Sequence, residues 1–346
     1  MPKARPESLR AAEVEPADTL ASSAGGALIA GSVVRAITGF ADVDTEFGRM
    51  RCQLRGRLRK ELVYPTSQYV RQSARAVRGI RGSKSVAVGD RVLIRRVDAE
   101  TGVVEEVLPR EGELTRRSAG EKPSAQTILT GIDQVVLVFA IRDPAPSLRM
   151  LDRFLVIAES ADVPAVIVVN KADLGALDDL GHDIEIYRKI GYPTILTSTV
   201  TGQGLEELRA ALAGKTSALA GPSGVGKSSL VNALCPGTDK RVGVVNPVTG
   251  KGRHVTTETR LHPLDMPEGG VIADTPGLRQ LTFWEIEPEG LDELFVEMDE
   301  YRGRCRFPGC THTHEPSCAV KAAVEQGSID QRRYESYVVL RQGVNT

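Results

Sequence analysis

The segment SALAGPSGVGKSSLVNAL, residues 217–234, carries the most specific evidence for the fold. Within it, GPSGVGKS at residues 221–228 fits the phosphate-loop pattern GxxxxGK[ST]. The apolar run before the loop predicts a strand, and KSSLVNAL predicts a helix whose N-terminus, with the loop's N–H groups, converges on a bound phosphate. Lys227 would reach the β- and γ-phosphates, and Ser228 would offer its hydroxyl to Mg²⁺. The residues assigned to this loop are Gly221, Pro222, Ser223, Gly224, Val225, Gly226, Lys227, Ser228 and Ser229.

A second motif, VIVVNKADL at residues 166–174, indicates recognition of guanine. Its Asp173 can accept hydrogen bonds from N1–H and the exocyclic amine of guanine, a donor pair that adenine lacks. An acceptor left unpaired by the wrong base costs about 1–3 kcal/mol. After another predicted strand, Ser198 and Thr199 can supply a backbone contact to the guanine O6. The residues assigned to base recognition are Asn170, Lys171, Ala172, Asp173, Ser198 and Thr199.

A third motif, DTPG at residues 274–277, ends the apolar run GVIAD. Asp274 there would face Mg²⁺ through water, and the N–H of Gly277 would meet the γ-phosphate. Ordinary GTPases place the phosphate loop before the guanine motif, whereas this chain places it after. We therefore expect a circularly permuted GTPase sheet, whose loops still meet because they all lie at the carboxyl ends of strands.

Three regions surround or contain these motifs. Apolar strands alternating with amphipathic helices over residues 122–283 predict a parallel sheet covered on both faces. Short β-rich stretches with glycine turns over residues 29–115 predict a β-barrel. Its fourteen Lys or Arg against two acids between residues 49 and 96 favour an OB-fold that contacts RNA backbone. We expect residues 1–28 to be disordered and residues 285–346 to be a helical zinc-binding domain.

The tail carries a compact set of metal ligands: Cys305, Cys310, His312 and Cys318. Three thiolates and one imidazole complete a tetrahedral structural Zn²⁺ site with no open position for catalysis. His314 is the alternative to His312 as the fourth ligand. The nearby arginines either bind RNA phosphates or form a solvated basic loop: Arg302, Arg304 and Arg306.

Together the permuted order and the segments GPSGVGKSSLVN, GRHVTT, DTPGL, GVVEEVLPREGELTR and CRFPGCTHTHEPSC resemble the ribosome small subunit-dependent GTPase A family, over about residues 30–340. The resemblance implies an OB domain, a permuted GTPase domain and a zinc-binding domain. It also implies a role in late maturation of the small ribosomal subunit, with contact to 16S rRNA and GTP hydrolysis stimulated by that subunit.

The catalytic machinery is incomplete by the ordinary pattern. A standard GTPase has a Gln shortly after the Gly of this motif, and that Gln orients the attacking water. In this chain Leu278 follows Gly277, and no side chain there can position water. The resemblance implies that His254 is the catalytic residue; the alternative is a loop histidine that contacts RNA or solvent. Val255 stands where the family usually has Thr, so both Thr256 and Thr257 remain candidates for the Mg²⁺ ligand. We expect slow hydrolysis by the protein alone.

No apolar run reaches the roughly 18 residues that a membrane span needs, and the first residues lack the apolar core of a secretory signal. We therefore expect a cytoplasmic protein without a membrane partner, and a monomer. Two other functions stay open at this point. One is an RNA-binding assembly factor that uses GTP only as a structural ligand, and the other is a permuted GTPase that acts on the large subunit.

Overall fold

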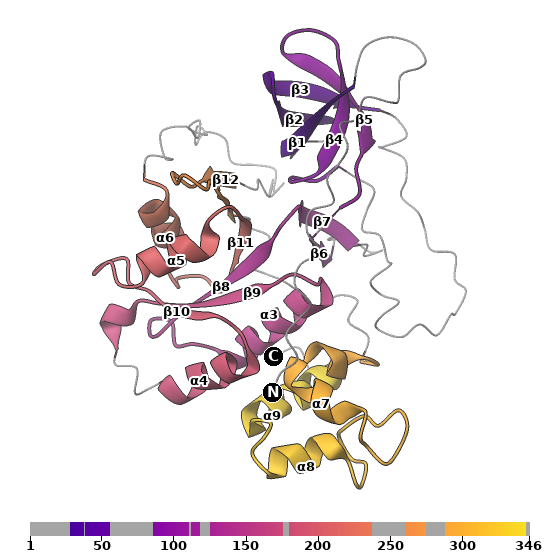
Figure 1. Cartoon of the computed structure of the whole chain (residues 1–346), viewed down its shortest axis with the longest axis vertical. Helices are drawn as coiled ribbons and strands as arrows, with labels where there is room; N and C mark the ends of the chain where they lie inside the picture. Colours follow the sequence, from indigo (N-terminus) through magenta and orange to yellow (C-terminus); the bar gives the residue numbers. More distant parts are fainter. Residues whose placement is uncertain are drawn as a thin grey trace, which may run out of the picture.

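The computed structural model describes residues 28–37, 39–55, 86–110, 112–117, 125–175, 180–236, 260–274 and 288–343. Along the long axis of the molecule a β-barrel, an α/β sheet domain and a helical tail follow one another (Figure 1). Within the described ranges, no helix has the length and apolar character needed to cross a membrane. The predictions for residues 1–27, His254, Thr256, Thr257 and Gly277 lie outside these ranges.

The barrel is closed and has five strands in the order β1-β2-β3-β5-β4, with only β3 and β5 parallel. The strands are β1 (Leu28–Ile37), β2 (Phe40–Thr45), β3 (Gly48–Leu54), β4 (Arg91–Arg96) and β5 (Thr101–Val107). Alternate side chains point inward, so that Val43, Met50 and Ile94 are fully buried. The prediction of an OB-type barrel is confirmed.

Much of the barrel's basic charge is locally neutralised. Arg49 pairs with Asp44 at 2.6 Å, and Arg51 pairs with Asp42 at 3.3 Å. Arg55 and Arg95 both pair with Glu105. Of the fourteen basic residues between positions 49 and 96, eight lie in the segment 56–85, outside the described residues. The described barrel surface therefore presents less unpaired positive charge than the residue count alone predicts.

A hairpin of β6 (Glu113–Arg117) and β7 (Ala125–Thr130) lies between the barrel and the sheet domain. Buried Asp90, just before β4, accepts two hydrogen bonds from Arg110 at 2.8 and 3.0 Å and one from Thr130 at 2.8 Å. Arg110 also donates to Thr127 at 3.0 Å. These charged contacts fasten the barrel to the hairpin.

The sheet domain contains six strands in the order β10-β9-β8-β11-β13-β12. They are β8 (Gln134–Ala140), β9 (Ala165–Asn170), β10 (Thr194–Leu196), β11 (Thr216–Ala220), β12 (Arg260–Pro263) and β13 (Val271–Asp274). Neighbours among the first five in the spatial order are parallel, as predicted. The expectation of an all-parallel sheet is wrong for the edge strand β12, which runs antiparallel to β13 after a short connection. A short connection allows a hairpin, whereas a parallel neighbour needs a long crossover.

Both faces of the sheet are covered, because each central strand is apolar on both sides. Leu137 and Phe139 pack with α3 (Leu148–Ser160) and α4 (Gly181–Ile190), whereas Val136 and Val138 pack with α5 (Leu205–Leu212) and α6 (Lys227–Leu234). The sheet thus holds the loops at its strand ends on a rigid two-sided core.

The tail comprises η5 (Leu291–Leu294), η6 (Val296–Met298), α7 (Asp299–Arg302), α8 (Ala319–Glu325) and α9 (Gln331–Arg341). The expected helical tail is confirmed. Its helical turns over residues 291–302 are interrupted by a break at Phe295, where the chain is extended with φ of −102° and ψ of 90°. This break turns Phe295 into a core with Met298, Val320 and Tyr337. Val156 of α3 belongs to the same core, so α3 is shared by the sheet domain and the tail.

Candidate nucleotide site and metal centre

The phosphate loop joins β11 to α6, as the pattern predicts. The Lys227 side chain is largely buried, and its Nζ donates to the carbonyl oxygens of Gly221 at 2.7 Å and Pro222 at 2.5 Å. Gly221 has φ of 138°, and a Cβ there would lie 2.1 Å from the carbonyl oxygen of Val138. Only glycine fits this close approach of loop and neighbouring strand. The arrangement holds an ammonium group in the loop before α6 begins.

Asn170, at the end of β9, joins the guanine motif to the phosphate loop. Its side chain is buried, and Nδ2 donates to the carbonyl oxygen of Val225 at 2.9 Å. Its Oδ1 accepts from Thr197 Oγ1 at 3.0 Å. Gly226, with φ of 94°, makes room, since a Cβ there would lie 2.4 Å from Asn170 Nδ2. Two segments 55 residues apart are thereby fixed to each other, a contact that the separate motifs do not predict.

Asp173 lies exposed in the turn η1 (Ala172–Leu174). The hydroxyl of buried Ser198 donates to its Oδ1. The same hydroxyl accepts from the backbone N–H groups of Val200 at 3.2 Å and Thr201 at 3.1 Å, which fixes the direction of its proton. The carboxylate is thus oriented with Oδ2 left to accept further donors. The prediction placed Ser198 at this site through its backbone; the structure adds its side chain.

A loop that the sequence analysis missed lies beside the guanine motif. Lys171 Nζ donates to the carbonyl oxygen of Asp143, in the segment that connects β8 to α3. The next residue, Pro144, approaches the phosphate loop: a Cβ on Gly224 would lie 3.6 Å from Pro144 Cδ. Asp and Pro in a connection are ordinary turn residues, so nothing in the sequence distinguishes this segment from other turns.

The two described residues predicted to bind Mg²⁺ stand at the end of β13 and in the first turn of α6. Asp274 is the last residue of β13 and is opposite Leu219 of β11, so its carboxylate is carried beside the start of the phosphate loop. Ser228 is exposed in the first turn of α6. A hydroxyl and a carboxylate are the hard donors that Mg²⁺ prefers. Ser223 and Ser229, also assigned to the phosphate loop, are exposed, and Thr199, which follows Ser198, is partly exposed.

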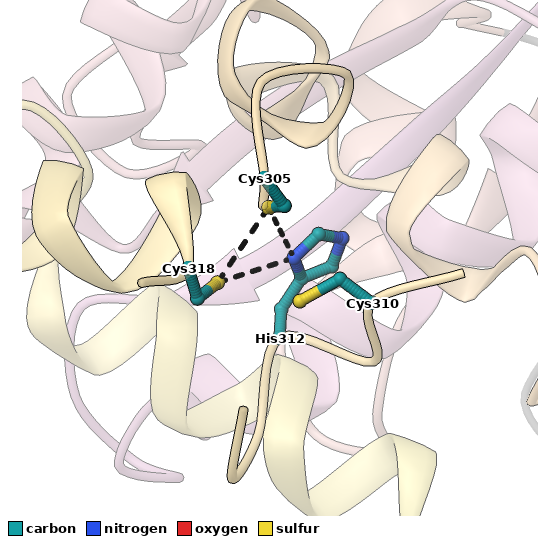
Figure 2. Close-up of side chains that lie close together, drawn as sticks. All are labelled: Cys305, Cys310, His312 and Cys318. Atoms are coloured by element: carbon teal, nitrogen blue, oxygen red, sulfur yellow. Dashed lines mark hydrogen bonds between the residues drawn. The ribbon is translucent and has the colours of Figure 1, made fainter. Parts of the chain in front are cut away.

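The four predicted zinc ligands converge in the tail (Figure 2). Their ligand atoms all lie within 4.8 Å of one another. His312 Nδ1 lies 3.5 Å from Cys305 Sγ and 3.4 Å from Cys318 Sγ, and these two sulfurs are 3.8 Å apart. Zinc–sulfur bonds of about 2.3 Å in a tetrahedron put sulfurs about 3.8 Å apart. The cluster, completed by Cys310, therefore fits one tetrahedral zinc ion.

The orientation of His312 has a structural cause. Its Nδ1 faces the thiols while its Nε2 lies 3.6 Å from Oδ2 of Asp292 in η5. Burial raises the pKa of Asp292, but the hydrogen bond and charge of His312, a backbone hydrogen bond and the charge of Arg302 together lower the pKa below its usual value. His314 lies outside the cluster with its side chain 82% exposed. The geometry therefore favours His312 as the ligand, with Asp292 as a support that the sequence analysis missed.

The arginines near the cluster differ in their surroundings. Arg302 pairs with Asp299 at 3.0 Å and Glu293 at 3.2 Å, and Arg304 pairs with Glu300 at 3.4 Å. The guanidinium of Arg306 instead lies 5.6 Å from the ring centre of exposed Phe307. Among the three, Arg306 has the surroundings best suited to an external contact.

Comparison with known proteins identifies the family. The model of the family described as RsgA GTPase matches residues 107–284, which include the entire sheet domain. The chain belongs to the RsgA GTPase family. It is therefore a GTP hydrolase of the circularly permuted kind, as the order of its motifs predicted.

Relatives in this RsgA GTPase family extend over nearly the whole chain. A protein of Gemmatimonas aurantiaca named small ribosomal subunit biogenesis GTPase RsgA is 45% identical over 90% of this chain and 96% of its own. A protein of the same name from Moorella thermoacetica is 42% identical over 89% of this chain and 94% of its own. The crystal structure of YjeQ from Thermotoga maritima superposes with a TM-score of 0.69, 36% identity, and coverage of 92% and 98%. The crystal structure of YloQ, described as a circularly permuted GTPase, superposes with a TM-score of 0.65 and 31% sequence identity. The match covers 92% of this chain and 95% of the YloQ chain.

Proposed function

We propose that this chain binds GTP and GDP where its phosphate loop and guanine motif meet, and hydrolyses GTP as a factor in biogenesis of the small ribosomal subunit. The observation that carries the nucleotide site is the 2.9 Å hydrogen bond from Asn170 to Val225. This bond holds the base-reading turn and the phosphate loop in one assembly, although their order along the chain is reversed. Relatives that are 42% and 45% identical over about 90% of this chain carry the name of such a factor.

Each part of the site has a proposed role. The carboxylate of Asp173, oriented by Ser198, accepts hydrogen bonds from guanine. When the nucleotide binds, Lys227 exchanges its bonds to the loop carbonyl oxygens for bonds to the β- and γ-phosphates. Ser228 and Asp274, with Thr256 or Thr257, would hold Mg²⁺. When bound with the nucleotide, Mg²⁺ neutralises charge that develops on the phosphates. Gly277 would meet the γ-phosphate, and His254 is the proposed residue that positions water.

The flanking domains are proposed to bind the subunit. The barrel and the tail lie at opposite ends of the sheet domain, so they can reach separated parts of 16S rRNA (Figure 1). We propose one structural zinc ion in the tail, a monomeric protein, and the cytoplasm as the place where such a factor meets ribosomal subunits. We place the domain limits at residues 29–115, 122–283 and 285–346.

The test is GTP hydrolysis by the purified, zinc-loaded chain, alone and with small subunits, large subunits or whole ribosomes, with ATP as a control. We expect slow hydrolysis alone and strong stimulation by small subunits only. Stimulation by large subunits alone would move the function to that particle. Tight GTP binding without hydrolysis under any condition would make GTP a structural ligand.

Replacing His254 by Ala tests the catalytic role separately. We expect the stimulated rate to fall while the affinity for a non-hydrolysable GTP analogue is retained, because His254 is proposed to position water and not to hold the nucleotide. Retained stimulated hydrolysis would assign His254 to the surface. Lys227→Ala is the companion variant that should lose nucleotide binding itself.

A further inference from the structure

A fully buried carboxylate joins the sheet domain to the tail. Asp152 lies in α3, and its side chain accepts a hydrogen bond from Tyr187 of α4 at 2.6 Å. Three further donors come from α9: Arg332 at 3.1 Å, Arg333 at 2.8 Å and Ser336 at 2.6 Å. A buried carboxylate is unfavourable unless donors surround it. Asp152 therefore requires α9 to be in place.

The same helix α9 holds the loop that carries the zinc ligands. Tyr334 donates to the carbonyl oxygen of His312 at 2.8 Å, and Tyr337 donates to that of Thr311 at 2.7 Å. On the side of Asp152, fully buried Arg333 also donates to both carboxylate oxygens of Glu297, at 2.7 and 3.0 Å. The ligand loop and α3 are therefore both held by one helix, α9.

The other end of this connection is the nucleotide site. α3 begins after the segment of Asp143 and Pro144, with its first turn capped by Ser147. That segment accepts a hydrogen bond from Lys171 of the guanine motif and lies against the phosphate loop at Gly224. Asp152 stands five residues beyond the cap, on the helix that sets the position of this segment.

We propose that Asp152 is a positioning residue for the nucleotide site, and that through α9 and α3 it makes guanine-nucleotide affinity depend on zinc occupancy. The inference rests on the proposed function, because it takes the loops around Asn170 and Lys227 as the nucleotide site. Coupling between two binding sites is reciprocal, so bound nucleotide strengthens zinc binding by the same factor. Coupled sites in proteins typically change each other's affinity about 5–150-fold.

The test uses the full chain and a fluorescent GDP analogue. Its dissociation constant is measured for zinc-loaded and zinc-stripped protein, in the wild type and in Asp152→Asn. We expect zinc removal to weaken wild-type GDP binding at least about fivefold. We expect zinc-loaded Asp152→Asn to bind GDP about as weakly as the zinc-stripped wild type, with little further loss on stripping.

The reverse measurement needs no variant. The chelator concentration that removes half of the zinc from the wild-type chain should rise when GDP is present, by the same factor. Tyr192→Phe is the matched control: it removes a 3.1 Å bond to Glu159 of α3 but no donor to Asp152, and it should leave the zinc dependence unchanged. Should Asp152→Asn fail to fold, Ser336→Ala removes a single donor to the same carboxylate.

The outcomes separate the two claims. Equal GDP affinity with and without zinc, together with no effect of GDP on zinc retention, would overturn the coupling and leave the proposed nucleotide site intact. A loss of zinc dependence in Tyr192→Phe equal to that in Asp152→Asn would also overturn the assigned route. A wild-type chain that binds no GDP when loaded with zinc would overturn the proposed function itself.

Discussion

At the level of single residues, Asp173 is the residue that we propose reads the base. Replacing it by Asn exchanges one acceptor for a donor that faces the exocyclic amine of guanine. We expect GDP binding to weaken by about 1.5–3 kcal/mol, roughly 10- to 150-fold, because a charged hydrogen bond is lost. Xanthine has a carbonyl where guanine has the amine, so binding of xanthosine diphosphate should improve. Competition titrations with both nucleotides measure this.

Ser198→Ala is the control for that substitution. It removes the hydroxyl that orients Asp173 but leaves both carboxylate oxygens as acceptors. We expect a smaller loss of GDP affinity and no gain for the xanthine nucleotide. If Asp173→Asn binds GDP as tightly as the wild type, Asp173 does not read the base.

Asp292 makes a second prediction at the residue scale, for metal binding. Its carboxylate fixes the ring of His312 so that Nδ1 faces the thiols. Partners of this kind typically change metal affinity about 10- to 100-fold, and we expect Asp292→Ala to weaken zinc binding by that range in a chelator competition. His314→Ala should leave zinc affinity unchanged, because this side chain is outside the cluster. The opposite pattern would assign the fourth ligand to His314.

At the scale of elements, the phosphate loop depends on a glycine beside Asn170. A Cβ at position 226 would lie 2.4 Å from Asn170 Nδ2, in a backbone conformation with φ of 94°. We expect Gly226→Ala to break the bond from Asn170 to Val225 and to abolish measurable GDP binding. The control is Gly191→Ala at the end of α4, where φ is 108° but nothing lies within 4 Å of the added Cβ.

This control separates two costs. Gly191→Ala carries only the conformational cost of a left-handed residue, about 1–2 kcal/mol, and should lower thermal stability while GDP binding is retained. If Gly226→Ala behaves like Gly191→Ala, the close approach of Asn170 to the loop is not needed for binding.

The sequence predicts most elements of the sheet domain because its strands are continuous apolar runs and its helices are amphipathic. It does not predict β2, whose outward-facing positions carry the partly exposed residues Asp42 and Asp44. Aspartate is rare in strands, and here it is supported by cross-strand pairs with Arg51 and Arg49. The direction of β12 also escapes prediction, since a short strand has the same composition in either direction.

The site shows the same division. Contiguous motifs such as the phosphate loop are read directly, because one local conformation performs one task. The role of Asp152 cannot be predicted from the sequence, because a single Asp in an amphipathic helix resembles a solvent-exposed residue. Its burial becomes evident only when the fold brings donors 180 positions away beside it. The supports of the site, including Asp292 and Asp143, come from contacts between distant segments and carry no local pattern.

At the scale of the whole molecule, the barrel is fastened through a buried ion pair. Arg110→Met would leave Asp90 buried without its cationic partner, since the Asp90 side chain is fully buried. Breaking a buried pair from one side typically costs about 3–5 kcal/mol. We expect the amide hydrogens of β4 and β5 to exchange faster while those of the sheet domain are unchanged.

The exposed pair of Arg49 and Asp44 provides the control, because such pairs contribute at most about 1 kcal/mol. Arg49→Met should therefore leave amide exchange in the barrel nearly unchanged. Equal effects of the two substitutions would show that the buried pair has no special role in fastening the barrel.

The hydrogen bonds that α9 donates to Asp152 also have a consequence during translation of the chain. At about 5–20 residues per second, roughly 10–35 s of translation separate Asp152 from the arginines of α9 that surround it. Until then the nascent chain carries a helix whose carboxylate lacks those donors and whose Val156 has no tail core to enter. A chain truncated after residue 330 should be cleaved within α3 by added protease faster than the full-length chain. Nascent products that still lack α9 would thus be open to degradation, whereas chains that have added it would resist the protease.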